Sequence, residues 1–221
     1  MEPEHRAATR AQSVAVAAHP DQLLEPGAAP DDRPDGARRE PLSCVRITET
    51  AVRYVDSNCL DELSMRRLGS ELGVEAMSLY RYFPSKGALL DAVVGWLLRD
   101  LALPDERGTM DWEGQVRDFA VSFRSITRQH PHLMPLLTVR SPDDPLLQGI
   151  HDRMIAVWCR AGLSPEDAQS AQRALQSYLS GSSQWHQESC QGEAAETDFR
   201  YGLDVFLDGV RSRVAEAAAA S

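Results

Sequence analysis

Six side chains whose chemistry suits contact with nucleic acid lie close together in the sequence: Arg66, Ser78, Tyr80, Arg81, Tyr82 and Lys86. An arginine can donate two parallel hydrogen bonds to the major-groove edge of guanine, a contact that discriminates against other bases by about 1–3 kcal/mol. Arg66 and Arg81 are therefore the predicted specificity residues. The hydroxyl of Tyr80 and the ammonium group of Lys86 suit phosphate oxygens, which position a protein on a duplex without reading its sequence. Each of these residues alone is common on a helix surface. The prediction of DNA contact therefore depends on their occurring together.

These side chains can act together only if two short helices hold them around a tight turn. Ser64 can cap the first helix, and Leu68 and Leu72 have the spacing of an inward face. Gly73 tolerates the left-handed backbone that ends a helix. Gly69 lacks the side chain that would keep two helices apart, so both glycines favour a helix-turn-helix.

A second short helix is predicted from about Glu75 to Phe83, because Leu79 and Phe83 are four residues apart and Pro84 follows. Leu79 and Phe83 then face the core. The outward arc, which would meet base edges or phosphates, consists of Ala76, Met77, Ser78, Tyr80, Arg81 and Tyr82.

The run LGVE followed by SLYRYFPSKGALLDAV resembles the DNA-binding domain of TetR-family transcriptional repressors, and most of all the tetracycline-repressor branch. The resemblance covers roughly residues 45–98, and beyond them only helix order and length match. In that family a leucine-tyrosine pair in the recognition helix and a lysine that opens the next helix recur, and they correspond to Leu79, Tyr80 and Lys86.

The resemblance implies an all-α fold with an N-terminal three-helix helix-turn-helix domain and a larger helical domain for ligand binding and dimerisation. It also implies DNA contacts by Arg66, Ala76, Met77, Ser78, Tyr80, Arg81, Tyr82 and Lys86. One departure concerns the end of the helix predicted over about 45–57, where the family usually has a glycine. Asn58 stands in the corresponding turn, and we expect it to adopt the left-handed conformation in place of glycine.

Composition agrees with a folded protein that binds DNA through one local surface. The chain has 221 residues, 43% of them hydrophobic, and a formal net charge of −10. Between Ser64 and Lys86, however, four basic residues outweigh two acidic ones. Because binding depends on the field at the contact surface, the acidic remainder does not exclude DNA and instead limits contact elsewhere.

Other site chemistries have little support. The four cysteines form no CxxC pair, so neither a zinc module nor a disulfide framework is indicated, and His130-Pro131-His132 is interpreted as the end of a helix. We expect no metal and no cofactor. No apolar run approaches the length of a membrane span, and the start lacks a secretory pattern, so a cytoplasmic protein is expected.

The chain is divided into three parts by composition and periodicity. Residues 1–40 are rich in alanine, proline and charge and are predicted to be a flexible tail, in which Arg38 and Arg39 could touch DNA. Residues 41–90 are assigned to the helix-turn-helix domain and residues 91–221 to a helical effector-binding and dimerisation domain. In the latter, helices are predicted from Lys86 to about Leu103, from about Trp112 to Gln129, from Pro145 to Ala161 and over two later segments, with fraying from Glu216.

A single short reading helix implies a two-fold partner, because such proteins bind half-sites about 34–36 Å apart. The last two long helices present apolar stripes, predicted to form a homodimer interface through Ala168, Ala171, Leu175, Leu179, Ser182, Phe199, Leu203, Phe206 and Val210, or else an intramolecular core. An effector pocket is predicted among side chains that are mostly apolar, and these could equally be core: Phe123, Met134, Leu137, Met154, Trp158, Tyr178, Gln184 and Trp185.

Together these features predict a ligand-responsive repressor, not an enzyme, that binds a palindromic DNA operator and is released by a small apolar or amphipathic effector. The drug-binding branch of the family has a magnesium-anchoring histidine after its fifth helix, and the corresponding stretch 133–138 has none, so the effector stays open. Two alternatives remain: a helical interaction protein without DNA binding, and an enzyme of an unrecognised type. No GxSxG, HExxH, P-loop or glycine-rich dinucleotide turn supports the enzyme.

Overall fold

The computed structural model describes residues 41–105, 111–138, 144–188 and 193–220, without the side chains of residues 138, 184–188 and 220. The predicted tail, with Arg38 and Arg39, lies outside them. The described residues contain helices and no strand, which confirms the all-α prediction. The elements are α1 Cys44–Ser57, η2 Leu60–Glu62, α2 Met65–Leu72, α3 Ala76–Leu79, α4 Lys86–Leu98, α5 Trp112–Gln129, η3 Pro131–Leu133, α6 Met134–Thr138, α7 Pro145–Ala161, α8 Pro165–Glu188 and α9 Glu193–Ala220.

Serine hydroxyls begin three of the first four helices. The Oγ atoms of Ser43, Ser64 and Ser85 each accept a hydrogen bond from the backbone amide three residues later, at 3.1–3.2 Å. Such caps satisfy amides that have no partner inside the helix. Gly73 and Gly162, with φ of 68° and 109°, end α2 and α7 in the left-handed conformation, which was predicted for Gly73.

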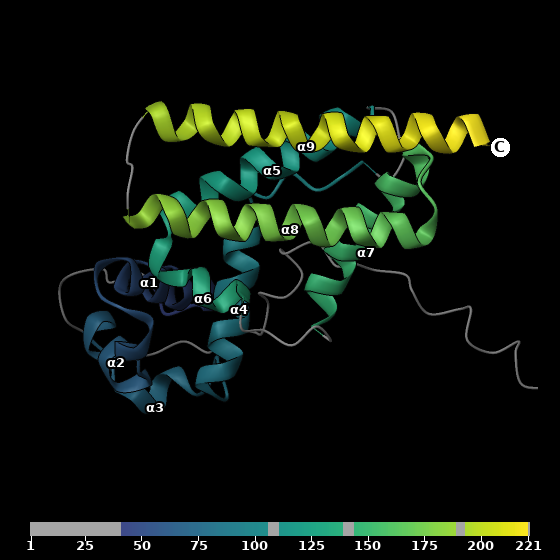
Figure 1. The fold of residues 1–221 in the computed structure, drawn as a ribbon. Helices are drawn as coiled ribbons and strands as arrows, with labels where there is room; N and C mark the ends of the chain where they lie inside the picture. The colour runs from purple at the N-terminus through teal and green to yellow at the C-terminus, as the bar shows by residue number, and fades with distance from the viewer. Residues whose placement is uncertain (1–40, 106–110, 139–143, 189–192, 221) are drawn as a thin grey trace, which may run out of the picture.

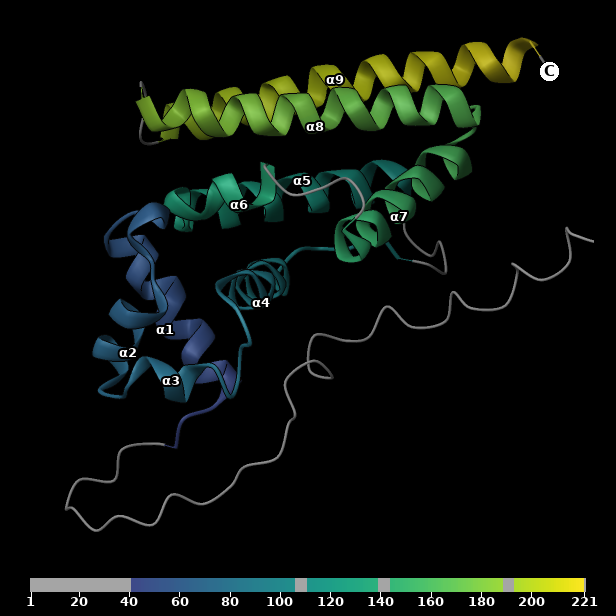
Figure 2. The same cartoon turned by 90° about the horizontal axis from the view of Figure 1, so that it is seen from below.

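The helices are arranged in layers (Figures 1 and 2). Helices α8 and α9 lie side by side along one face of the molecule, and α5, α6 and α7 form the next layer. Helices α1 to α3 form a separate unit at the opposite side, joined to the rest through α4. The domain boundary predicted after residue 90 falls inside α4, so this helix belongs to both units. None of the helices in the described residues combines the length and apolar character that a membrane span needs.

Several predicted helix ends differ from the structure. Helix α3 ends at Leu79, and the chain continues as a turn in which the amides of Tyr82 and Phe83 both donate to the Leu79 carbonyl, at 3.0 and 2.9 Å. Pro84 disfavours a helical conformation only at Phe83, the residue before it, so the end of α3 at Leu79 is set by the turn and not by the proline alone. Helix α4 ends at Leu98 and not near Leu103, since the chain turns there to bury Leu101. Helix α9 continues to Ala220, beyond the predicted fraying at Glu216.

The turn after α1 also differs from the prediction. Asn58 has φ −133° and ψ −132°, so it is not left-handed. Its side-chain amide instead donates to the carbonyl oxygen of Tyr54 at 2.7 Å, and its backbone amide donates to Val55. These hydrogen bonds satisfy the last carbonyls of the helix without the glycine conformation.

Candidate nucleic-acid interface

The turn between α2 and α3 brings the two helices into backbone contact. A Cβ atom on Gly69 would lie 2.8 Å from the carbonyl oxygen of Val74 and 3.2 Å from the amide nitrogen of Ala76. Leu79 is fully buried and Phe83 nearly so, which fixes the rotation of the segment that carries the outward residues. The close approach needs a glycine at position 69, so the sequence dictates the geometry of this turn.

We define the recognition surface as Arg66, Met77, Tyr80 and Arg81, the exposed members of the predicted DNA-contacting set. Met77 is 72% exposed and Tyr80 43%. Both views place α3 at the side of the molecule away from α8 and α9, with no other helix over it (Figures 1 and 2). The other predicted contact residues are half-buried, and two of them, Ala76 and Tyr82, pack against the core; the remaining two are Ser78 and Lys86.

The second arginine of α2 has a structural partner. Arg67 donates from NH1 to the carboxylate of Glu62 at 2.6 Å and to the hydroxyl of Tyr54 at 3.3 Å. These contacts hold α2 against η2 and α1, and the hydrogen bond to Tyr54 is the main cause that raises the pKa of Arg67. Arg66 beside it is exposed, and its contact with DNA stays a prediction.

A polar joint connects the helix-turn-helix unit to the rest of the chain. His130, which caps α5, contacts Asp56 of α1 through Nδ1 and Oδ2 at 2.8 Å, and its ring lies edge-on to Trp96 of α4 at 5.4 Å. The other oxygen of Asp56 and the indole nitrogen of Trp96 are buried without a hydrogen-bond partner among the described residues. His130 therefore does more than end a helix, and three helices meet at this point.

Most residues predicted for an effector pocket are buried or half-buried among the helices, and their role in binding an effector stays a prediction. Met154 and Trp158 are fully buried, and the indole nitrogen of Trp158 donates to Gln172 at 3.1 Å. The Tyr178 hydroxyl donates to the carbonyl oxygen of Phe199 at 2.6 Å. The other described members of the set are half-buried, namely Phe123, Met134 and Leu137. Gln184 and Trp185 lie in α8, but their side chains are outside the described part.

The stripes predicted for a dimer interface lie mostly inside the single chain. Ala168, Leu175, Leu179, Phe199, Leu203 and Val210 are at most 7% exposed within the single chain. Ala171 and Phe206 pack against that core, and Ser182 is half-buried. These side chains are used for packing within the chain, which was the alternative interpretation. An interface on α8 and α9 would have to use their outward faces, where Tyr201 is 71% and Val205 55% exposed.

Two groupings carry no sequence signal that would have revealed them. One is the contact between Asp56 and His130, which are 74 residues apart. The other is a cluster in which Glu196 of α9 binds Arg124 and Arg128 of α5. Arginines four residues apart on the polar side of a helix are usually solvated, so only the packing of α9 over α5 distinguishes these two.

Comparison with known proteins agrees with this geometry. Residues 47–93 match the family of bacterial regulatory proteins described as the tetR family. The HTH-type transcriptional repressor DrrR1 of Streptomyces coeruleorubidus is 30% identical over 171 residues, which cover 76% of this chain and 63% of that protein. The chain spans about three fifths of the length of this and similar curated relatives.

Two solved structures share the fold over nearly their whole length. A TetR variant from Acinetobacter baumannii AYE, solved with minocycline, is 27% identical, with a TM-score of 0.64 over 76% of this chain and 96% of that one. BioQ, solved with its double-stranded DNA operator, is 26% identical, with a TM-score of 0.60 over 78% of this chain and 99% of that one. The helix-turn-helix segment of the chain, residues 47–93, therefore belongs to the TetR family of bacterial regulatory proteins, and the helix order of the rest agrees with these relatives.

Proposed function

We propose that the chain is a ligand-responsive transcriptional repressor that binds a palindromic operator as a homodimer in the cytoplasm. The observation that carries this proposal is the recognition surface, which is exposed, bears two arginines and is set at a fixed angle by the contact between Gly69 and α3. The operator complex of BioQ, a protein of the same fold, supports DNA as the partner.

A homodimer is proposed because one recognition surface covers only one half-site. Its interface would lie on the outward faces of α8 and α9, around Tyr201 and Val205, since the inward faces are buried within the chain. Tyr201 and Val205 are one turn apart on α9, so they form a joint apolar patch, which marks a contact surface as scattered side chains do not. This replaces the residues expected from the sequence while keeping the same pair of helices.

Release by a small effector is proposed from the joint between α1, α4 and η3. A ligand that prefers one arrangement of the larger helical unit shifts the helix-turn-helix unit only if the two are mechanically connected. The contact between His130 and Asp56 is such a connection. The minocycline complex of the TetR variant supports a small molecule as the effector class.

A mobility-shift assay with DNA from upstream of the chain's own gene tests the DNA-binding function. We expect the wild-type protein to retard one fragment, with affinity that falls steeply as salt increases. Arg81→Ala and Tyr80→Ala should weaken the complex, whereas Arg173→Ala, an exposed arginine on α8, should not. If the wild type retards no fragment, the proposed function fails, and the alternative of a helical interaction protein is favoured.

A further inference from the structure

A surface hollow of about 430 Å³ lies between α5 and α9, away from the recognition surface. Its lining is polar apart from one valine and consists of Val121, Arg124, Ser125, Arg128, Gln129 and Glu196. Five of these residues belong to the last three turns of α5. The hollow is about half open to solvent, so it can enclose only part of a small ligand.

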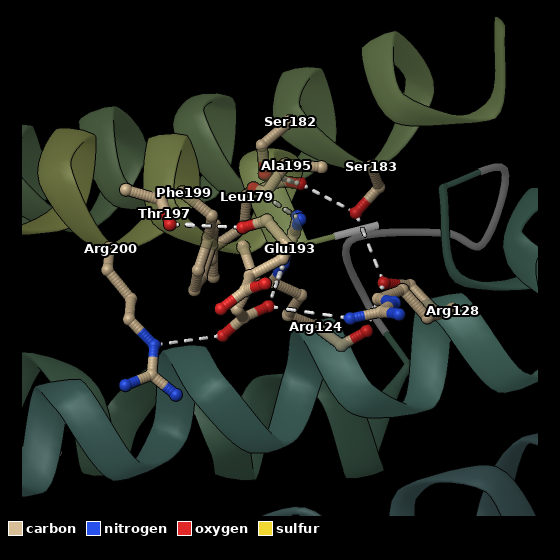
Figure 3. Close-up of polar contacts among 12 residues, drawn as sticks. Arg124, Arg128, Leu179, Ser182, Ser183, Glu193, Ala195, Thr197, Phe199 and Arg200 are labelled. Carbon is tan, nitrogen blue, oxygen red and sulfur yellow. Dashed lines mark hydrogen bonds and ion pairs between the residues drawn. The ribbon is translucent and has the colours of Figure 1, made fainter. Parts of the chain in front are cut away.

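One carboxylate at this hollow binds three arginines. Glu196 accepts from Nε of Arg124 at 3.1 Å and NH1 of Arg128 at 3.5 Å through Oε2, and from Nε of Arg200 at 3.1 Å through Oε1. Figure 3 shows the arginines of α5 and the arginine of α9 reaching toward the same point between the helices. Burial alone would raise the pKa of Glu196, but the hydrogen bonds from Arg200 and Arg124 outweigh it and lower the pKa below its usual value.

The two α5 arginines differ in environment. Arg124 is only 4% exposed, donates to the carbonyl oxygen of Ala195 at 2.9 Å and lies over the ring of Phe199 at 4.3 Å, so its charge is fixed in place. Arg128 is 57% exposed, and NH1 is its only guanidinium nitrogen with a partner among the described residues. A guanidinium carries five N–H donors, so Arg128 can bind a second carboxylate.

Charge at the hollow is the reverse of charge over the whole chain. Among the lining residues, Arg124 and Arg128 outweigh Glu196 by one positive charge, and Arg200 binds Glu196 from outside the lining, in a protein whose net charge is −10. The side chains of Ser125 and Gln129 add hydrogen-bonding groups at the wall, and Val121, 39% exposed, adds an apolar contact. Glu196 already shows that a carboxylate fits the arginine geometry.

We propose that this hollow is a binding site for a small organic carboxylate with a short apolar body, held by Arg128 and Arg124 beside Glu196. The ligand carboxylate takes donors that Arg128 directs into the hollow, and the apolar body lies on Val121. Glu196 acts as an internal competitor, because its own carboxylate occupies part of the same arginine cluster.

The position of the site also gives it a route to the recognition surface, and this step rests on the proposed function. Arg124 and Arg128 lie in the last two turns of α5, and His130 follows directly as the cap that contacts Asp56 of α1. A ligand that binds the end of α5 therefore acts next to the joint between the two units.

Calorimetric titration of the full chain without DNA tests the site, with benzoate as the probe and benzamide as a neutral molecule of the same shape. We expect saturable binding of benzoate only. Arg128→Gln should weaken benzoate binding about tenfold, the value of one charge-assisted hydrogen bond. Arg213→Gln, which removes an exposed arginine elsewhere on α9, should leave it unchanged. Glu196→Gln removes the competing charge while keeping an acceptor for Arg124, so it should tighten binding about tenfold.

The proposal is overturned if benzoate shows no saturable binding at millimolar concentration, if benzamide binds equally well, or if Arg128→Gln and Arg213→Gln behave alike. Thermal melting of each variant establishes that it is folded. If Glu196→Gln does not fold, the comparison of Arg128→Gln with Arg213→Gln alone tests the carboxylate site. A separate mobility shift with and without benzoate reports on regulation. Benzoate binding that depends on Arg128, in a chain that retards no DNA, would retain the site and reject the proposed function.

Discussion

At the scale of single residues, Arg81 and Lys86 should make different kinds of contact with DNA. Arg81 is exposed beside α3 and can bond to a base edge, whereas Lys86 is half-buried at the start of α4 and suits a phosphate. Arg81→Ala should cost about 1–3 kcal/mol on the preferred site and relax specificity at one base pair. Lys86→Ala should weaken all sequences alike and reduce the slope of log affinity against log salt by about one.

Fluorescence anisotropy on the preferred fragment and on single-base variants, over a range of salt, measures both effects. Arg173→Ala serves as the control, because it removes the same charge from an exposed position on α8. Equal losses for Arg81→Ala on every base variant would show that Arg81 contacts only phosphate. The assignment of Arg81 to a base edge and of Lys86 to a phosphate would then be wrong.

The same scale shows what a sequence can and cannot reveal. Gly73 was predictable, because a left-handed residue at the end of a helix strongly favours glycine. Asn58 was not, because asparagine can satisfy a helix end either by adopting that backbone or through its side chain, and the structure uses the side chain. His130 could not be paired with Asp56, since their contact depends on how two units pack.

At the scale of elements, the approach of α2 to α3 predicts opposite effects for two glycine substitutions. Gly69→Ala would place a Cβ atom 2.8 Å from the backbone oxygen of Val74, so the turn must shift, and we expect a loss of about 1–3 kcal/mol in the free energy of unfolding. Gly95→Ala, within α4, would meet nothing within 4 Å and should gain up to about 1 kcal/mol from helix propensity.

Urea denaturation measures the two free energies under identical conditions. An unchanged m-value would show that both variants unfold in the same way as the wild type. If Gly69→Ala were as stable as the wild type, the backbone contact would not constrain the recognition surface. The contact between Gly69 and α3 could then no longer be used to explain how the recognition surface is oriented for DNA.

Ion pairs between α5 and α9 predict a dependence of stability on pH. The guanidinium of Arg211 donates two hydrogen bonds to Glu113, at 2.7 and 2.6 Å, and these contacts hold the pKa of Glu113 below its usual value. A lowered pKa in the folded state stabilises the protein above the unfolded value, and the contribution disappears as pH falls through the folded pKa. Glu113→Gln should therefore lower the unfolding free energy at pH 7, and the difference from the wild type should disappear as pH falls through the lowered pKa of Glu113.

Thermal or urea unfolding at a series of pH values tests this. Asp118→Asn, an exposed carboxyl on the same helix, is the matched control and should show no such convergence. A difference between Glu113→Gln and the wild type that is constant over the whole pH range would mean that the variant acts through packing and not through charge.

Helix extents were predicted well where a cap side chain marks them and poorly where tertiary packing decides. The starts of α2, α4 and α7 follow from Ser64, Ser85 and Asp144, whose side chains accept from the amides of the first turn. The end of α4 depends on the burial of Leu101, and that of α3 on the turn before Pro84. In both cases tertiary packing sets the end of the helix, and no local sequence signal is strong enough to predict it.

At the scale of the whole molecule, apolar stripes on α8 and α9 identified the helices but not the partner of each face. Leu175 and Leu203 are fully buried inside one chain, while Tyr201 and Val205 stay exposed on the same pair of helices. Periodicity shows that a face is apolar and does not say whether the neighbouring helix belongs to the same chain. The recognition surface could be predicted because glycine spacing, a following proline and exposed arginines all occur within one short segment.

The outward face of α9 therefore provides the test of assembly. Val205 is 55% exposed, so Val205→Asp should leave the single chain folded, with a change in unfolding free energy within about 0.5 kcal/mol once dimerisation is accounted for. Buried in a two-fold interface, the same carboxylate would meet its symmetry mate without a counter-charge, and the dimer should dissociate. Light scattering coupled to gel filtration should show the mass of two chains for the wild type and of one for Val205→Asp.

Leu146→Asp provides the control, because Leu146 is 44% exposed on α7, and this variant should remain dimeric. Because a monomer presents one recognition surface and the dimer two, Val205→Asp should also lose most of its affinity for a palindromic site while keeping the salt dependence of a half-site. A Val205→Asp protein that stays dimeric would place the interface elsewhere. A monomer that still binds the full site tightly would instead show that DNA recognition does not require the two-fold dimer.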